Sequence, residues 1–160
     1  MVKKPYSLID NPDYRPNVGI MLINKKHQVL AGDVKHNPGV WMMPQGGIDP
    51  GETPLQAMQR ELLEETSIKF DATRLIKEHN DWLSYQFGNP LEKDGDIYVG
   101  QRQKWFLLEY NGMPPDAAKT KDQEFRHFEW VEPVWLMRHT TKIKIVVYRD
   151  IFAAFGHYFP

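Results

Sequence analysis

The segment that decides the fold runs from Gly46 to Ile68 and reads GGIDPGETPLQAMQRELLEETSI. Within it, Thr53 and Gln56 are spaced as in a capping box, and the proline between them suits the first helical position, so a helix is expected to begin there. Apolar residues then recur at helical spacing, which predicts a stripe that faces a core. The residues of this stripe are Leu55, Met58 and Leu62.

Three glutamates on the predicted helix, Glu61, Glu64 and Glu65, are three and four residues apart or adjacent. They therefore share one face, with Cβ atoms about 5–6 Å apart. A like-charged pair costs a few tenths of a kcal/mol in solvent, but roughly 3 kcal/mol at 5 Å in a cleft with an effective dielectric of about 20. A divalent cation would remove that cost, and hard oxygen donors favour Mg²⁺ or Mn²⁺ over zinc. On the glutamates alone, a solvated helix face is the better interpretation.

The glycine-rich loop before the helix favours a metal site instead. Gly46, Gly47 and Gly51 permit positive φ and a close approach of the backbone to a ligand. Such a loop can direct carbonyls to a metal and amides to phosphates. Glu52 ends the loop, and Arg60 immediately precedes the first helix carboxylate. The whole pattern predicts a divalent-metal site that hydrolyses a phosphoanhydride bond.

The composition of the 160-residue chain suits one globular domain over residues 1–160, with residues 1–13 as an N-terminal extension. The net charge is −1, so any nucleic-acid contact must be local or limited to one end of the polymer, and DNA is not an expected partner. The absence of cysteine excludes disulfides and thiolate metal sites and fits the cytoplasm. Apolar runs are too short to span a bilayer, and no signal-peptide core is present, so no membrane association is expected.

The remaining elements predict a mixed α/β protein in which strands dominate and two helices are prominent. Strands are expected at 18–24, 28–32, 74–87, 97–110 and 125–131, with a short extended piece at 40–43 and a second helix at about 142–154. Glycine, proline and polar clusters predict loops at 33–39, 88–96 and 111–121. The tryptophans are expected to be core residues rather than platforms for bases: Trp41, Trp82, Trp105, Trp130 and Trp135.

The segment 46–68 resembles the Nudix box: Gly46, five residues, Glu52, seven residues, then a run from Arg60 to Ile68. One position departs, because Ser67 stands where the family usually has glycine; this site closes the helix, and serine fits there at modest strain. Further stretches, at 14–19, 41–47, 100–106, 124–125 and 130–131, are similar to the bacterial RNA pyrophosphohydrolases and to the related dinucleoside polyphosphate hydrolases. The resemblance implies an α/β fold, the Nudix α/β/α sandwich with a mixed β-sheet, which carries the catalytic loop and helix of the box.

The resemblance also implies the catalytic roles. Arg60 would hold Glu52 or Glu61 in its productive rotamer. Glu124, in a loop far from the box, would act as a further ligand or as the general base. The expected cofactor is Mg²⁺, with Mn²⁺ as a substitute. The implied metal ligands are Glu61, Glu64, Glu65, Glu124 and a backbone carbonyl at Gln45 or Gly46.

The resemblance implies a substrate site as well. Arg15 and Lys104 are expected to contact phosphates, with Arg102 a weaker candidate. In the RNA enzymes an aromatic residue at the position of Ile143 holds the terminal base. Because this chain has isoleucine there, the resemblance leaves undecided how the base is held. Lys144 can still donate a hydrogen bond to it. The implied substrate-binding residues are Arg15, Gln45, Lys104, Ile143 and Lys144.

Three functions remain open on the sequence. The first is an RNA 5′-pyrophosphohydrolase, which converts a 5′-triphosphate or diphosphate end to a monophosphate and so exposes the transcript to decay. The second is hydrolysis of dinucleoside polyphosphates or nucleoside triphosphates, because the same box serves all of these substrates. The third is a non-catalytic nucleotide-binding module, against which the intact Arg60 and the three helix glutamates argue. The expected partner is thus a 5′-phosphorylated RNA end or a nucleotide polyphosphate.

Overall fold

The computed structural model describes residues 13–158, so nearly all of the predicted extension at 1–13 lies outside the described residues. The strands are β1 (Tyr14–Ile23), β2 (Val29–Val34), β3 (Trp41–Met42), β4 (Gln45–Gly47), β5 (Arg74–Lys93), β6 (Asp96–Glu109) and β7 (Phe125–Val131). The α-helices are α1 (Pro54–Thr66), α2 (Pro133–His139) and α3 (Lys142–Ala154), with 3₁₀ turns at Phe70–Ala72, Ala117–Lys119 and Gly156–Tyr158. Within residues 13–158, no helix is long and apolar enough to cross a membrane.

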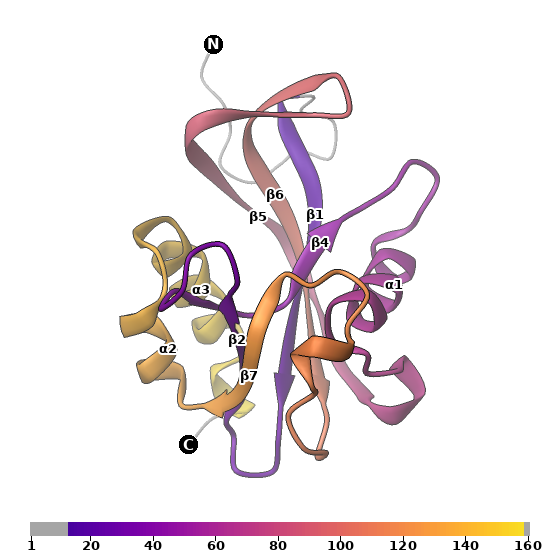
Figure 1. The fold of residues 1–160 in the computed structure, drawn as a ribbon, viewed down its shortest axis with the longest axis vertical. Coiled ribbons are helices and arrows are strands. Elements are labelled where there is room, and N and C mark those ends of the chain that lie inside the picture. The colour runs from indigo at the N-terminus through magenta and orange to yellow at the C-terminus, as the bar shows by residue number, and fades with distance from the viewer. Residues whose placement is uncertain (1–12, 159–160) are drawn as a thin grey trace.

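The seven strands form one mixed sheet in the order β3-β2-β1-β6-β5, with β4 paired to β1 and β7 paired to β2. The long β1–β6 pair is parallel, from Tyr14 opposite Gly100 to Ile23 opposite Glu109, while the neighbouring pairs are antiparallel. Helix α1 lies on one side of the sheet, and α2 and α3 lie on the other (Figure 1). The predicted α/β/α sandwich with a mixed sheet is confirmed.

Alternation along the central strands divides the core into two layers. Successive strand side chains point to opposite faces of a sheet. Accordingly, Ile20 and Leu22 of β1 belong to the core cluster beneath α1, whereas Met21 and Ile23 belong to the cluster beneath α2 and α3. Both faces of β1 are therefore buried, as expected for a central strand covered by helices on each side.

Helix α1 begins and ends as the sequence predicts. The Thr53 hydroxyl accepts from the Gln56 amide at 3.2 Å, and the Gln56 side chain accepts from the Thr53 amide at 2.9 Å. Ser67 closes the helix in the left-handed conformation, with φ of 64°. Met58 is fully buried, but Leu55 is 36% exposed, so the predicted stripe is wrong at its first position. The buried face begins two to three residues later, with Ala57 and Met58.

The structure differs from the predicted elements in three main places. The loop expected at 88–96 is instead strand, because β5 and β6 continue into a long hairpin that turns at Asp94 and Gly95, with φ of 54° and 83°. Positive φ at both positions is the signature of a type I′ turn. Pro90 is tolerated because β5 is an edge strand whose pairing is irregular between Gln86 and Leu91. In addition, residues 45–47 form strand β4, and helix α2 was not expected.

Candidate metal centre

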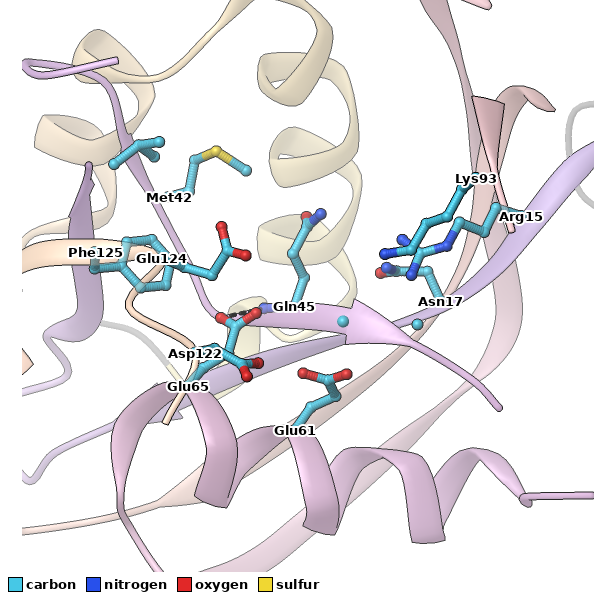
Figure 2. Close-up of a pocket in the computed structure, with 13 residues that line it drawn as sticks. Arg15, Asn17, Met42, Gln45, Glu61, Glu65, Lys93, Asp122, Glu124 and Phe125 are labelled. Carbon is cyan, nitrogen blue, oxygen red and sulfur yellow. Dashed lines mark hydrogen bonds between the residues drawn. The ribbon is translucent and has the colours of Figure 1, made fainter. Parts of the chain in front are cut away.

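A pocket of about 260 Å³ lies between α1, β4 and the loop before β7. Acidic side chains gather at its base and on one wall, while Arg15 and Lys93 lie together on the opposite side (Figure 2). Carboxylates and cationic side chains therefore lie on opposite sides of the same pocket. The residues that line it are Arg15, Asn17, Val34, Met42, Gln45, Gly46, Gly47, Glu61, Glu65, Lys93, Asp122, Glu124 and Phe125.

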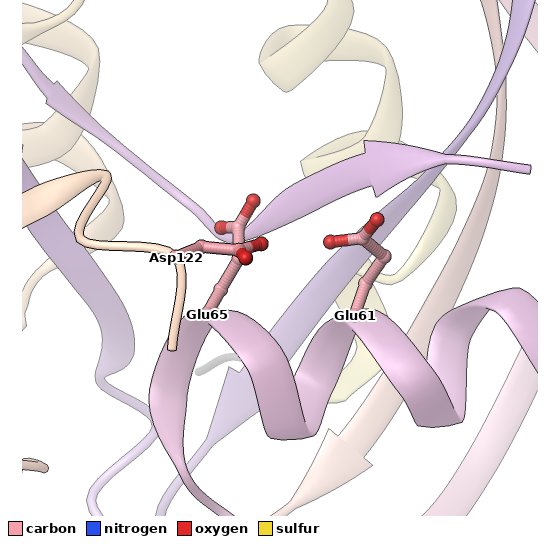
Figure 3. Close-up of side chains that lie close together, drawn as sticks. All are labelled: Glu61, Glu65 and Asp122. Atoms are coloured by element: carbon pink, nitrogen blue, oxygen red, sulfur yellow. The ribbon is translucent and has the colours of Figure 1, made fainter. Parts of the chain in front are cut away.

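Three carboxylates converge at the base of this pocket. Glu61 and Glu65 come from successive turns of α1, and Asp122 comes from the loop before β7 (Figure 3). One oxygen of each lies within 4.8 Å of the others, and the two glutamates are only 7% and 6% exposed. Carboxylate oxygens grouped in this way suit a hard divalent cation such as Mg²⁺ or Mn²⁺.

The carboxylates of this cluster are difficult to ionise in the absence of a cation. Burial raises the pKa of Glu61 to about 7, although its hydrogen bond to Arg60 works in the opposite direction. Burial, reinforced by the charges of Glu61 and Glu124, raises the pKa of Glu65 well above its usual range. Burial and the neighbouring Glu64 also raise the pKa of Asp122. A bound cation would reverse this preference by stabilising the ionised forms.

Arg60 joins the loop of the box to the helix. Its Nε and Nη2 donate to the two carboxylate oxygens of Glu52 at 2.7 and 2.8 Å. Its Nη1 donates to Glu61 at 2.8 Å, and Nη2 also donates to the Gly47 carbonyl at 2.8 Å. Both of the partners that the resemblance implies are therefore in contact with Arg60. The bidentate contact lowers the pKa of Glu52, and the separate hydrogen bond from Nη1 fixes the Glu61 side chain against the loop.

The three glycines of the box are required for two different reasons. A Cβ on Gly46 would collide with the Glu61 carboxylate, and a Cβ on Gly47 would collide with the Arg15 guanidinium. Neither glycine has positive φ; both are needed for close approach. Gly51, by contrast, has φ of 84° with open space around it, so its conformation is what requires glycine.

Asp122 was not among the predicted site residues. Its amide donates to the Glu64 carbonyl at 3.1 Å, which ties the loop to the end of α1. Gln123 follows in the left-handed region, with φ of 51°, and its side chain donates to the Thr120 carbonyl at 2.6 Å. The sequence gives no spacing signal for Asp122, because these loop contacts, rather than a helix or strand period, place it in the pocket.

The other two predicted acids lie at the margin of this cluster. Glu124 lines the pocket on its wall beside Phe125 (Figure 2). The Glu64 carboxylate accepts from Arg60 at 3.2 Å and from Lys121 at 3.3 Å, and it is not part of the three-carboxylate cluster. Its role as a metal ligand stays a prediction.

The predicted substrate residues separate into groups. Arg15 lines the metal pocket and donates to Gln101 at 3.2 Å. Lys144 is buried, and its Nζ donates to the Gln45 side chain and, at 2.8 Å, to the Tyr85 hydroxyl. Ile143, beside it at the start of α3, is 37% exposed and does not line the pocket. Thus Arg15 and Gln45 reach the metal pocket, whereas Ile143 and Lys144 lie outside its lining.

Lys104 and Arg102, the other predicted phosphate contacts, lie away from the acidic cluster. Both line a second, neighbouring pocket. The Arg102 guanidinium lies 4.9 Å from the ring centre of Trp82, and Lys104 Nζ donates to the Asn80 carbonyl at 2.8 Å. The structure does not bring these two cations into the metal pocket.

Comparison with known proteins agrees with this geometry. The NUDIX domain model matches residues 13–151, which is most of the chain. This chain belongs to the Nudix family. An RNA pyrophosphohydrolase of Francisella tularensis subsp. mediasiatica is 38% identical over 154 residues, which cover 94% of this chain and 99% of the relative. The RNA pyrophosphohydrolase of Proteus mirabilis is 36% identical over 153 residues, covering 93% and 86% respectively.

Solved structures show the same Nudix fold. A C. elegans Ap4A hydrolase complex superimposes with a TM-score of 0.64 at 21% identity, covering 91% of this chain and 99% of that one. The E. coli dihydroneopterin triphosphate pyrophosphohydrolase gives the same TM-score at 18% identity, covering 86% and 95%. Nudix hydrolases generally use divalent metal ions, which agrees with the acidic cluster formed by α1 and the loop before β7.

Proposed function

We propose that this chain is an RNA 5′-pyrophosphohydrolase, which converts 5′-triphosphate or diphosphate RNA ends to 5′-monophosphate in the cytoplasm and so starts mRNA decay. It is a Nudix hydrolase that acts on a phosphoanhydride bond. The observation that carries this proposal is the pocket in which a cluster of carboxylates faces Arg15 and Lys93. The choice of RNA as substrate is supported by the RNA pyrophosphohydrolases that align with nearly the whole chain.

The donor set of the pocket fits Mg²⁺, with Mn²⁺ as a substitute. Glu61, Glu65 and Asp122 would hold the ion, and Glu64 would join them on leaving Lys121. The carbonyl of Gln45 or Gly46 would complete the coordination. A bound divalent cation supplies charge neutralisation on the phosphates and lowers the pKa of a water molecule.

The chain's own residues do the rest. Arg60 holds Glu61 in one rotamer through the 2.8 Å hydrogen bond, so its ligand oxygen needs no reorganisation. Glu124, on the pocket wall, accepts the proton of the attacking water as general base. Arg15 and Lys93 bind the phosphate oxygens from the opposite side of the pocket. No covalent nucleophile is required, because the water attacks phosphorus directly.

One assay tests this proposal against the alternatives. The protein is incubated with Mg²⁺ and, in parallel, with 5′-triphosphorylated RNA, a dinucleoside tetraphosphate and GTP. We expect the RNA to be the best substrate by kcat/KM. Turnover of the dinucleoside tetraphosphate or GTP that is ten times faster would replace RNA by that substrate. The absence of turnover on all three would leave a nucleotide-binding module.

A further inference from the structure

A second pocket, of about 620 Å³, opens beside the metal pocket. The loop of the Nudix box forms one wall with Ile48 and Pro50, and the β5–β6 hairpin forms another with Trp82 and Tyr98. A volume of this size is typical of sites for small organic ligands. The pocket lies outside the acidic cluster, and the proposed hydrolysis does not by itself require it.

The two pockets adjoin at Arg15 and Lys93. Both side chains line both pockets, and Figure 2 shows them side by side at the edge of the metal pocket. A phosphate held by this pair would therefore lie at the boundary between the two pockets. A group covalently attached to that phosphate could enter the second pocket while the neighbouring phosphates remain near the carboxylates.

The lining of the second pocket suits an uncharged aromatic group better than a polyphosphate. Acidic side chains on its lining equal the basic ones in number, so the pocket as a whole has no excess of positive charge. Two of its cations are already engaged: Arg102 lies over the Trp82 ring at 4.9 Å, and Lys104 donates to the Asn80 carbonyl. What remains is a surface of aromatic rings, prolines and one isoleucine, which can pack against a flat ring.

We propose that this second pocket binds a nucleobase of the substrate, with Trp82 and Tyr98 as its aromatic walls and Arg15 and Lys93 holding the phosphate that connects the base to the metal centre. The proposal rests on the proposed function for the kind of substrate. The base belongs either to a nucleotide of the RNA or to one nucleoside of a dinucleoside polyphosphate. Acidic residues at the hairpin tip, Asp94 and Asp96, offer acceptors for the amino group of a base.

Binding without turnover tests the pocket directly. A GTP analogue with methylene bridges at both the α,β and the β,γ positions carries a base and methylenediphosphonate does not, and neither probe contains a phosphoanhydride bond. With Mg²⁺ present, Trp82→Ala should weaken calorimetric binding of the nucleotide about 10-fold, in the range found for base stacking on an aromatic side chain. Binding of methylenediphosphonate should not change. Trp82→Phe, which keeps a ring, should restore most of the nucleotide affinity.

The control is Trp130→Ala. Trp130 is also half-buried, but it lies on β7 stacked on Tyr110, lining neither pocket. If Trp82→Ala does not fold, Tyr98→Ala on the opposite strand of the hairpin replaces it. Equal losses for the nucleotide and for methylenediphosphonate, or no loss for either probe, would overturn the proposal. So would an equal loss of nucleotide affinity in Trp130→Ala.

Hydrolysis separates the two sources of the base. A rise of about 10-fold in KM, for triphosphorylated RNA only, would assign the pocket to RNA; the same rise for the dinucleoside tetraphosphate only would assign it to a second nucleoside. An unchanged KM for both would overturn the proposal.

The proposed function and the pocket can fail separately. If the protein is inactive but binds the methylene nucleotide through Trp82, the proposed function fails and the pocket proposal holds. If the protein hydrolyses RNA ends but is insensitive to Trp82→Ala, the pocket proposal fails and the proposed function holds.

Discussion

Replacing Glu61 by glutamine should stabilise the metal-free protein at alkaline pH and weaken its response to metal. Burial raises the pKa of Glu61 from 4.5 to about 7. Because the folded pKa is above the unfolded pKa, the contribution of this carboxyl to stability is complete below pH 4.5 and is lost as the pH rises through 7. The loss amounts to about 3 kcal/mol of unfolding free energy at pH 8, and to less than about 1 kcal/mol at pH 5.

Glu61→Gln removes the ionisation and keeps an oxygen that can accept from Arg60. In chelator at pH 8, we therefore expect the variant to unfold at a higher temperature than the parent. At about 2–4 °C per kcal/mol for a chain of this size, the difference is up to about 10 °C. At pH 5 the two proteins should differ by only about 2 °C. Differential scanning calorimetry at both pH values measures the effect.

Magnesium should remove most of this difference at pH 8. At 100 times its dissociation constant, a ligand that binds only the folded state adds about 2.7 kcal/mol. The parent should gain most of this, and the variant, which has lost one carboxylate ligand, should gain much less. Glu92→Gln, on the exposed hairpin, is the matched control and should behave as the parent. The reasoning is refuted if Glu61→Gln is no more stable than the parent in chelator at pH 8, or if its advantage is the same at pH 5.

Four further substitutions test the loop and helix of the box. Gly46→Ala should displace the Glu61 carboxylate and lower kcat at least 100-fold. Gly51→Ala meets no neighbouring atom but is strained at positive φ, so it should lower the free energy of unfolding by about 1 kcal/mol in chemical denaturation and keep most of the activity. Arg60→Lys loses the bidentate contact with Glu52, and kcat should fall about 10- to 100-fold with little change in KM. Glu64→Gln should abolish turnover while its circular dichroism and unfolding temperature stay close to the parent's; near-parental turnover would confine the metal site to the three-carboxylate cluster.

The parts of the fold that were predictable from sequence depend on local signals. Helix α1 carries its own start and stop, through the capping box at Thr53 and the left-handed Ser67. The β5–β6 hairpin shows the opposite case. Gly88, Asn89 and Pro90 favour a break, but pairing with β6 keeps the segment extended across an irregular stretch. The true turn does have a local signal, the Asp-Gly pair at 94–95, which outweighs the proline once both strands are known to be long.

The site divides in the same way. Glu61 and Glu65 were predictable, because a spacing of four residues on a helix is enough to bring two carboxylates together. Asp122 was not, because its position depends on a backbone hydrogen bond to Glu64 and on the turn at Gln123. Lys93 enters the pocket from a hairpin that the sequence had suggested was a loop. Residues placed by tertiary contacts between distant segments have no period from which they could be recognised.

Lys144 shows how burial changes the meaning of a predicted contact. An ammonium group has three donors, and two of them are used by the side chains of Gln45 and Tyr85. Gln101 also donates to the Tyr85 hydroxyl and accepts from Arg15, so a chain of hydrogen bonds connects Lys144 to a cation of the metal pocket. One donor remains for a substrate base, but the side chain is only 5% exposed. A base can therefore reach Lys144 only if this buried network rearranges, whereas the pocket beside Trp82 is already open.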